Sequence, residues 1–425
     1  MTQLSESPLS ESPLTIDDID LSSIDFWLRP PEEREAAFAL LRRERPVPFF
    51  EELALENLAA GPGYYCLTKY DDVMYASRHA DLFASGRGTQ VVDMPEELND
   101  MLGSMINMDA PRHTKLRLLV NKGFTPRMVA RIEDYVHDIA RECVQEIVGK
   151  GSCDFVTEVA APMPLRIICD MMGIPRSDAG YIFEQTNHLL GGLDPEYNET
   201  VADLFAGGWN LFDYAQKLGA ERLENPKDDI TTTLMQAEVE GQRLTAAELG
   251  SFFVLLCTAG NETTRNAIAH GLYTLTAHPD QRQLLIDDPD RHMPGFVEEI
   301  VRWSTPVIHF RRTVMADTEL PSGRASFKEG DKVTLWYNSA NRDEDAFDHP
   351  EVFDITRSPN EHVGFGGGGP HFCLGANLAR RELRVLFEEL FRVLPDIGSV
   401  GEPARLQSNF INGLKHLSAE FTPAA

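Results

Sequence analysis

The sequence is short of cysteine and has no clustered cysteine pairs. Only six cysteines occur among 425 residues, and no two of them form a C-x-x-C pair. This spacing excludes the common zinc-binding patterns. Few, scattered thiols are typical of a reducing compartment and not of a disulfide-stapled secreted protein. We therefore expect a cytoplasmic protein.

Positive charge is also scarce. The chain carries 39 basic and 67 acidic side chains, for a formal net charge of −28. Such a chain repels nucleic acid and anionic membrane surfaces, so neither is expected as a partner. No segment is long enough to span a bilayer, and the acidic N-terminus lacks the apolar run of a signal peptide. We expect a monomer without a membrane span.

The remaining pattern is mainly helical. Residues 1–18 contain a direct Ser-Glu-Ser-Pro-Leu repeat and are predicted to form a disordered acidic arm. Residues 19–425 are predicted to form one large, mainly α domain with a small β-sheet region, because no linker divides them. Strands are expected at 63–68 and between about 310 and 336. Helices are expected at 31–43, 69–77, 126–150, 157–172, 177–190, 197–223, 244–276 and 376–394.

The helix at 244–276 is the longest of these. Thr245 and Glu248 have the spacing of a capping box at its start. The stretch Phe252–Cys257 is apolar on all sides, which predicts a buried helix. Within this helix, Ala259 and Gly260 are small enough to admit a ligand, and Glu262 and Thr263 are polar groups in apolar surroundings. From the residues alone, a back-bond from Thr263 and a buried ion pair of Glu262 are slightly better explanations than a functional site.

Cys373 stands between a glycine run and the start of the last long helix. Gly366–Gly369 precede it, and Gly375 follows it. A cysteine at a helix N-terminus lies near unpaired amides, which stabilise a thiolate that can bind metal. The simpler alternative is a small buried hydrophobic residue. A phosphate-binding loop is excluded because no Gly-Lys-Ser/Thr sequence follows the glycines.

Two further charged pairs have helical spacing. Glu299 and Arg302 are three residues apart, which as a surface pair would contribute under about 1 kcal/mol. His113 and Arg117 are four apart and together suit a carboxylate. Each pattern is common by itself.

Taken in order, these motifs resemble the cytochrome P-450 superfamily of haem-thiolate monooxygenases. The resemblance extends from about residue 19 to residue 417. Its elements are the His113/Arg117 helix, Ala259-Gly260-x-Glu262-Thr263-Thr264, Glu299-x-x-Arg302, Arg312, Arg357 and Gly369-x-His371-x-Cys373-x-Gly375. One position departs from the family pattern: the usual aromatic lies seven residues before the cysteine, where this chain has Gly366, and Phe365 stands eight before it.

The resemblance implies haem b (iron protoporphyrin IX) with Cys373 as the thiolate ligand of the iron. It implies that Thr263 holds dioxygen and a water molecule, with Glu262 assisting proton delivery, and that Glu299 and Arg302 form a structural buried pair with Arg357. The haem-contacting residues would be His113, Arg117, Ala259, Arg312, Gly366, His371, Cys373 and Gly375, with His113, Arg117, Arg312 and His371 paired to the propionates.

The resemblance also implies insertion of one atom of O2 into an unactivated C–H bond of a small hydrophobic substrate. Among bacterial members the chain is most similar to actinobacterial enzymes that hydroxylate methyl-branched lipids and sterol side chains. Terminal (omega) hydroxylation of a methyl-branched or isoprenoid lipid is therefore expected, with sterol side-chain hydroxylation as the alternative enzyme activity and a non-catalytic haem-thiolate sensor as the alternative of another class. The expected substrate wall is Ile106, Thr258, Ala259, Ile308, Phe310, Phe410 and Ile411.

Electrons must come from another protein, because no flavin or iron–sulfur segment follows residue 417. Bacterial members of the family typically use a ferredoxin and a ferredoxin reductase. An acidic ferredoxin would need a local basic patch, for which the candidates are Lys115, Arg127, Arg131, Arg380 and Arg381.

Overall fold

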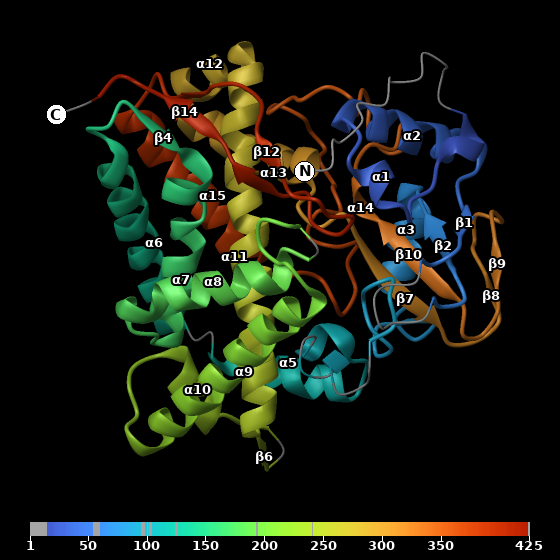
Figure 1. Cartoon of the computed structure of the whole chain (residues 1–425), viewed down its shortest axis with the longest axis horizontal. Helices are drawn as coiled ribbons and strands as arrows, with labels where there is room; N and C mark the ends of the chain where they lie inside the picture. Colours follow the sequence, from blue (N-terminus) through green and yellow to red (C-terminus); the bar gives the residue numbers. More distant parts are fainter. Residues whose placement is uncertain are drawn as a thin grey trace.

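The computed structural model describes residues 15–53, 60–94, 98–99, 101, 104–123, 126–192, 194–239 and 241–423. In Figure 1, helices fill one side of the molecule and a small β-sheet region lies on the other. This arrangement confirms the predicted fold class, a mainly α domain with a minor sheet. None of the helices in the described ranges has the length and apolar content needed to cross a membrane.

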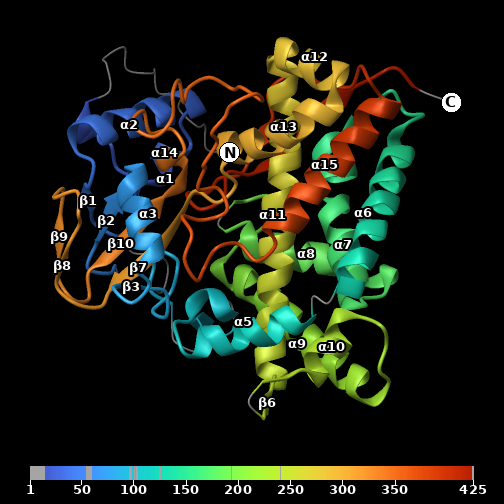
Figure 2. The same cartoon turned by 180° about the vertical axis from the view of Figure 1, so that it is seen from behind.

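Helix α11 (Ala246–Ala277) passes through the middle of the helical region, as Figures 1 and 2 show from opposite sides. It begins as predicted: the Thr245 hydroxyl accepts from the backbone N–H of Glu248, and the Glu248 carboxylate accepts from the N–H of Thr245. Most of its residues are buried because it contacts α7, α8, α9, α13 and α15. An element apolar on all sides is stable only in such a central position.

The other helices surround α11 or cover the sheet. Figure 2 shows α15, which follows Cys373, beside α11 and α6. The bounds are α1 (Ile24–Trp27), α2 (Pro31–Glu44), α3 (Tyr70–Arg78), α5 (Arg112–Gly123), α6 (Pro126–Ile147), α7 (Pro162–Met172), α8 (Ala179–Leu190), α9 (Val201–Glu224), α10 (Ile230–Gln236), α12 (Pro279–Asp287), α13 (Pro289–Ser304), α14 (Tyr337–Ala340) and α15 (Ala376–Val393), with single turns η1 (Ile16–Asp18), η2 (Ser104–Asn107), η3 (Val156–Ala160) and η4 (Arg176–Asp178).

The main sheet has the strand order β1-β2-β10-β7-β3. Its centre is the antiparallel pair β7 (His309–Val314) and β10 (Lys332–Trp336), in the region predicted to be strand. Strand β2 (Tyr64–Leu67) pairs with β10 in parallel, and β1 (Phe49–Phe50) and β3 (Phe83–Ala84) form the edges. The sequence pattern did not predict that β2 would join these distant strands.

Small two- and three-stranded sheets complete the described part of the chain. They consist of β4 (Ser152–Asp154), β5 (Glu238–Val239), β6 (Gln242–Arg243), β8 (Thr318–Glu319), β9 (Ser326–Phe327), β11 (Gly398–Ser399), β12 (Ala404–Arg405), β13 (Leu414–His416) and β14 (Ser418–Glu420). Strands β8 and β9 lie in the region between about 310 and 336 where the sequence pattern predicts strands. The other two- and three-residue strands were not predicted, because an alternating pattern needs about four residues to be recognised.

Residues 1–14 of the predicted disordered arm lie outside the described residues. The end of the predicted arm differs from the expectation, since Ile16–Asp18 form a 3-10 turn. Thr15 and Asp18 cap this turn reciprocally, and the guanidinium of Arg45 donates to Asp17 at 3.2 Å. The ordered domain therefore begins by Thr15 and not at residue 19.

Replacing Thr245 tests the start of α11. We expect Thr245→Ala to lower the free energy of unfolding by about 1 kcal/mol, because one helix N–H loses its side-chain acceptor. Thr245→Ser keeps that oxygen and should unfold as the wild type does. Equal urea midpoints for the alanine variant and the wild type would contradict a contribution from this cap.

Candidate active site

Cys373 differs from the other cysteines in its exposure. All six lie in the described part of the chain; five are buried and Cys373 is exposed. It lies just before α15, two residues ahead of the N-cap Gly375. Although solvent reaches its surface, burial among protein atoms raises the pKa of the Cys373 thiol, and hydrogen bonds from the N–H groups of Gly375 and Ala376 act in the opposite direction. The amides at the start of α15 thus offset part of the effect of burial and stabilise negative charge on the sulfur.

The loop before Cys373 is a tight turn closed by the cysteine itself. The backbone N–H of Cys373 donates to the carbonyl of Phe365 at 3.0 Å. The guanidinium of Arg380 lies 4.4 Å from the centre of the Phe365 ring. The carbonyl of Phe365 accepts a hydrogen bond from the Cys373 amide. Phe365 therefore stays close to Cys373, although it stands eight residues before the cysteine and not seven.

The glycine run packs against α3. A Cβ on Gly367 would lie 2.6 Å from the Ser77 hydroxyl, and one on Gly369 would lie 2.3 Å from the Ser77 carbonyl. Gly366 has a positive φ of +96°, as Gly369 has one of +76°, but its Cβ would come no closer than 3.8 Å to another atom. Two of the four glycines therefore admit the end of α3, whereas Gly366 supplies the turn.

Four groups predicted to hold the propionates converge from α5, β7 and the cysteine loop: His113, Arg117, Arg312 and His371. The rings of His113 and His371 have centroids 4.4 Å apart. Arg117 donates to the carbonyls of Pro370 at 2.8 Å and Phe372 at 2.9 Å. Within the described ranges, none of the four has a carboxylate at salt-bridge distance.

The electrostatics of this cluster suit an anion. Burial, together with the charges of Arg312, His113 and Arg117, lowers the pKa of His371 to about 3. Burial and the charge of Arg117 also lower the pKa of His113, and its buried Nε2 has no hydrogen-bond partner. A carboxylate placed here would offset the repulsion between cations and supply the missing acceptor. The residues therefore fit the acidic groups of a haem.

One face of α11 is accessible although the helix is otherwise buried. Ala259 is exposed, and Leu255, Leu256 and Thr263 are half-buried, while the residues between them are mostly buried. Gly260 is also half-buried, but it faces α7, because a Cβ there would lie 2.9 Å from Ile168 Cδ1. Small size at Gly260 thus serves helix packing, and Ala259 supplies the open position for a flat ligand.

Glu262 and Thr263 both have the intrahelical partners considered above. The Thr263 hydroxyl donates to the carbonyl of Ala259 at 2.7 Å. Glu262 is buried, pairs with Arg265 and accepts from the side-chain amide of Asn266 at 3.0 Å, while its Oε2 has no partner. Arg265 and Asn266 were missed from the sequence, although they stand three and four residues after Glu262, where helix neighbours lie.

Arg265 extends this cluster to another helix. Its Nη1 donates to Oδ1 of Asn187 on α8 at 3.0 Å. The carboxylate of Glu262 is therefore linked through Arg265 to the end of α8.

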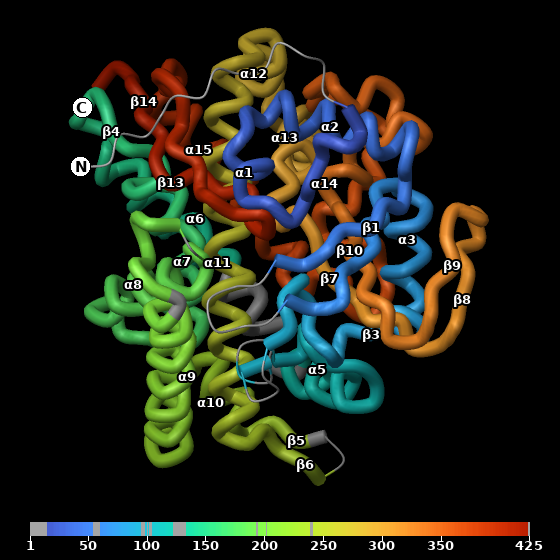
Figure 3. Tube along the Cα trace, turned by 45° about the vertical axis from the view of Figure 1, so that its right-hand side comes forward, coloured from blue at the N-terminus to red at the C-terminus, as the bar shows by residue number. Residues whose placement is uncertain are grey.

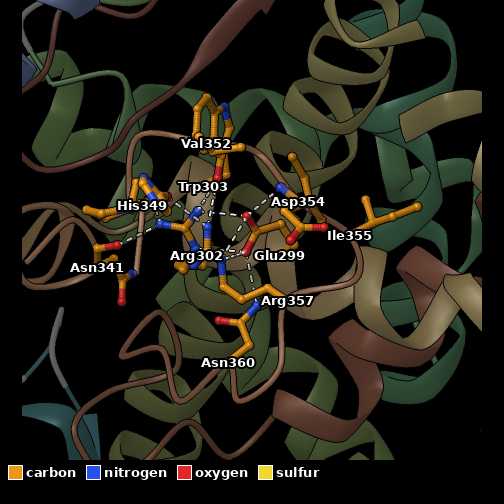
Figure 4. Close-up of polar contacts among 12 residues, drawn as sticks. Glu299, Arg302, Trp303, Asn341, His349, Val352, Asp354, Ile355, Arg357 and Asn360 are labelled. Carbon is orange, nitrogen blue, oxygen red and sulfur yellow. Dashed lines mark hydrogen bonds and ion pairs between the residues drawn. The ribbon is translucent and has the colours of Figure 1, made fainter. Parts of the chain in front are cut away.

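Glu299 and Arg302 on α13 form a completely buried ion pair, shown in Figure 4. Arg302 donates twice to Glu299, at 2.7 and 2.8 Å, and to the carbonyls of Asn341, Pro350 and Val352. Glu299 also accepts from the Asp354 N–H at 2.9 Å and the Asn360 side chain at 3.0 Å, and Arg357 lies 3.3 Å away. This network joins α13 to residues 341–360 and agrees with the expected structural role.

The expected substrate wall comes from four separate segments. Ile106 is half-buried on η2, and Thr258 donates to the carbonyl of Val254 at 2.9 Å on α11. The rings of Phe310 and Phe410 have centroids 5.6 Å apart, and Ile411 bridges to Val307. These contacts place residues 307–310 beside 410–411.

Ile308 has a different environment from the rest of that wall. Its N–H donates to the Phe410 carbonyl at 2.8 Å, but its side chain is buried in a cluster with Trp27 and Trp336. Its contact with substrate stays a prediction.

The proposed ferredoxin patch is partly paired with acids. Arg380 donates to Glu298 at 2.6 and 2.9 Å, and Arg381 pairs with Glu133. Lys115 is exposed on α5. The side chains of Arg127 and Arg131 lie outside the described residues.

Comparison with known proteins identifies related chains. The family model "Cytochrome P450" matches residues 209–394. A Mycobacterium tuberculosis protein named methyl-branched lipid omega-hydroxylase is 50% identical over 95% of this chain and 94% of its own length. A Rhodococcus jostii steroid C26-monooxygenase is 42% identical over 91% of this chain and 82% of its own. The structure of a Mycobacterium marinum cytochrome P450 in complex with pseudoionone is similar with a TM-score of 0.89 and 44% identity, covering 96% of this chain and 100% of the other.

Removing the Arg302 side chain tests the buried pair. We expect Arg302→Ala to lose about 3–5 kcal/mol of stability and to lose bound haem, because Glu299 keeps a buried charge without its main partner. The matched control is Arg392→Ala, which breaks an exposed pair of the same spacing with Glu389 and should cost under about 1 kcal/mol. Full haem occupancy and unchanged unfolding of Arg302→Ala would refute the structural role.

Glu382 on α15 predicts a specific pH dependence. It is buried, its Oε2 has no partner, and burial raises its pKa to about 8. The unfolded chain loses this proton near pH 4.3, whereas the folded chain keeps it until about pH 8. Stability is therefore retained below pH 4.3 and falls as the pH rises towards 8, by at most about 1.4 kcal/mol per pH unit.

Glu382→Gln should remove this dependence. Melting temperatures of the two proteins, measured from about pH 5 to about pH 8, should diverge, with the wild type losing more stability as the pH rises. Parallel curves would show that Glu382 does not contribute in this way.

Proposed function

This chain belongs to the cytochrome P450 family and is a monooxygenase that uses haem b, and we propose that it hydroxylates the terminal carbon of a methyl-branched or isoprenoid lipid. The observation that carries this proposal is the 50% identity, over nearly the full length of both chains, with proteins named methyl-branched lipid omega-hydroxylase. The apolar character of the expected substrate wall supports a hydrophobic substrate.

The overall reaction consumes O2, two electrons and two protons, and gives a hydroxylated product and water. The haem, when bound, supplies the activation of O2 and the delivery of oxygen to carbon. Cys373 would provide the sulfur that binds the haem iron, and the N–H groups of Gly375 and Ala376 would stabilise negative charge on it. The surrounding chain thereby sets the electron density that the sulfur donates.

Four residues would hold the two propionates: His113, Arg117, Arg312 and His371. Arg117 already anchors the cysteine loop through Pro370 and Phe372. The same guanidinium would therefore fix the loop and orient the bound group. Ala259 lies on the accessible face of α11, where the lack of a larger side chain leaves room for a flat ligand.

Thr263 and Glu262 would assist the delivery of protons. The Thr263 hydroxyl donates to Ala259, so its oxygen lone pairs can accept from a water or another donor. The free Oε2 of Glu262 can accept a proton, provided that Arg265 continues to hold the other oxygen. A carboxylate with one oxygen held by an arginine and the other oxygen without a partner can accept and release a proton without a change of position.

Sterol side-chain hydroxylation is the second candidate. The 42% identity with a protein named steroid C26-monooxygenase favours it. Both candidate substrates, branched lipids and sterols, must place one end of the molecule at the reactive centre. They differ in the width of the rest of the molecule, which the substrate wall must accept. Phe310 and Phe410, whose ring centroids are 5.6 Å apart, would limit that width.

Electrons would come from a ferredoxin reduced by a ferredoxin reductase. Lys115 and Arg381 project from α5 and α15, the helices that flank the cysteine loop. A positive patch there would orient an acidic partner despite the net charge of −28.

A binding screen separates the substrate candidates. We expect methyl-branched fatty acids or isoprenoid acids to shift the ferric haem from low to high spin more strongly than cholesterol-type sterols do. Turnover with ferredoxin, ferredoxin reductase and NADPH should then give the terminal alcohol. Tight binding and turnover of sterols alone would replace the branched-lipid proposal, and normal spectra without product from any of them would favour the sensor.

Charge reversal tests ferredoxin docking. Lys115→Glu with Arg381→Glu should slow reduction by ferredoxin about tenfold at low ionic strength and less at high salt. Arg392→Glu, on α15 and paired with Glu389, is the matched control. Wild-type reduction rates in the double variant would refute docking on this face.

A further inference from the structure

A cavity separate from the candidate active site lies where α2, the end of α11, α13 and the β12–β13 region meet; we call it the second cavity. Figures 1 and 3 show α2 and α14 close to α13. The cavity has a volume of about 340 Å³, which is within the range of small-molecule sites. Four aromatic residues line it: Trp27, Phe38, Tyr273 and Trp303. It contains none of the expected haem contacts, and Ile308 is its one residue from the expected substrate wall.

Two arginines line this cavity without a carboxylate partner. Within the described ranges, neither Arg34 nor Arg405 has an acidic group at salt-bridge distance. Their guanidinium groups lie over aromatic rings instead, Arg34 at 5.9 Å from the centre of Trp27 and Arg405 at 5.8 Å from that of Tyr273. Burial and the charge of Arg405 lower the pKa of Arg34 to about 10, so the two cations are close enough to repel each other.

A third arginine is incompletely satisfied. Arg342 is 9% exposed, and its guanidinium lies 3.9 Å from the centre of the Trp303 ring. Its Nη2 donates to Glu35 at 3.1 Å and to the Trp303 carbonyl at 3.3 Å, but Nε and Nη1 have no partner. This cation therefore keeps donors that the described residues do not use.

The acidic residues of the cavity do not balance these cations. Glu35 is engaged by Arg342, and Glu32 is exposed at the rim. The fourth arginine, Arg42, is matched by Glu344 at 2.8 Å. Nearby Glu402 accepts from the Tyr273 hydroxyl. Arg34 and Arg405, which are both half-buried, therefore have no acid partner at salt-bridge distance within the described ranges.

His270, one of the two histidines that line the cavity, adds no charge. Burial and the charges of Arg405 and Arg34 lower the pKa of His270 to about 3, so it is neutral, and its Nε2 lies 3.1 Å from the carbonyl of Asn412. His278 lies between Trp303 and Phe353. The positive character of the cavity thus comes from arginine and persists at all physiological pH values.

We propose that this cavity is a second ligand site that binds an organic carboxylate, with its carboxylate between Arg34 and Arg405 and its apolar body against Trp27 and Trp303. Arginine forms paired hydrogen bonds to a carboxylate, and aromatic faces accept a flat or aliphatic body. An inorganic anion would use only the two arginines, and a neutral apolar compound would use only the aromatic faces.

Fluorine NMR of the haem-loaded enzyme tests the site. The probe is 4-(trifluoromethyl)benzoate, and 4-(trifluoromethyl)benzyl alcohol is its neutral counterpart. We expect the benzoate to bind without altering the haem absorption spectrum, and the alcohol to bind about tenfold or more weakly, because it forms no ion pair.

Variants locate the binding. Arg34→Gln with Arg405→Gln should weaken benzoate binding about tenfold or more, and Arg43→Gln, an exposed arginine on the same helix, should not change it. Arg405→Gln alone, on the short strand β12, provides an intermediate step if the double variant melts at a lower temperature.

Three results would overturn the proposal. They are equal affinity for the benzoate and the alcohol, unchanged affinity in both Arg405→Gln and the double variant, and a haem spectral shift that follows benzoate binding. Inorganic phosphate, added as a competitor, should not displace the benzoate, and full displacement would show an unspecific anion site instead.

Discussion

The buried carboxylate of Glu299 is the interaction on which the site depends. It receives Arg302 and Arg357 together with donors from Asp354 and Asn360, and Arg302 in turn holds three backbone carbonyls of the chain between residues 341 and 352. Asn341 continues the connection, because its Oδ1 accepts from the N–H of Val363, at the start of the cysteine loop. A long irregular segment is thereby fixed by charge-assisted hydrogen bonds where regular secondary structure is absent.

The electrostatics of the whole chain follow from two opposite demands. A net charge of −28 keeps the surface acidic. Inside, the cations Arg117 and Arg312 lie beside the two histidines His113 and His371, where the propionates of a haem would bind. The second cavity repeats this pattern with Arg34 and Arg405, which lack the acid partners that most described arginines have.

Much of the fold could be predicted from local patterns. The cap at Thr245, the all-apolar run from Phe252 and the last helix after Cys373 all depend on neighbours within a few residues, so periodicity was sufficient. Pairing of β2 with β10 could not be predicted, because strands separated by more than 250 residues carry no local signal of their register. The short strands β12 and β13 could not be predicted either, because two or three residues are too few to show an alternating pattern.

The candidate site was predictable in identity and less so in environment. Spacing picked out Cys373, Glu262 and the Glu299/Arg302 pair, but it did not show that Gly367 and Gly369 face α3 or that Gly260 faces Ile168. Those contacts depend on which elements meet in space. The partners of Glu262 could have been inferred, since Arg265 and Asn266 follow it at helical spacing.

The most direct test of this account is hydrogen–deuterium exchange of the haem-loaded Glu299→Gln variant. The account predicts that amides in residues 341–375 exchange faster than in the wild type, because the neutral side chain no longer holds Arg302 and Arg357. Amides in the middle of α11 should keep their protection. Wild-type exchange throughout residues 341–375 would contradict the claim that one buried carboxylate orders the segment that presents Cys373.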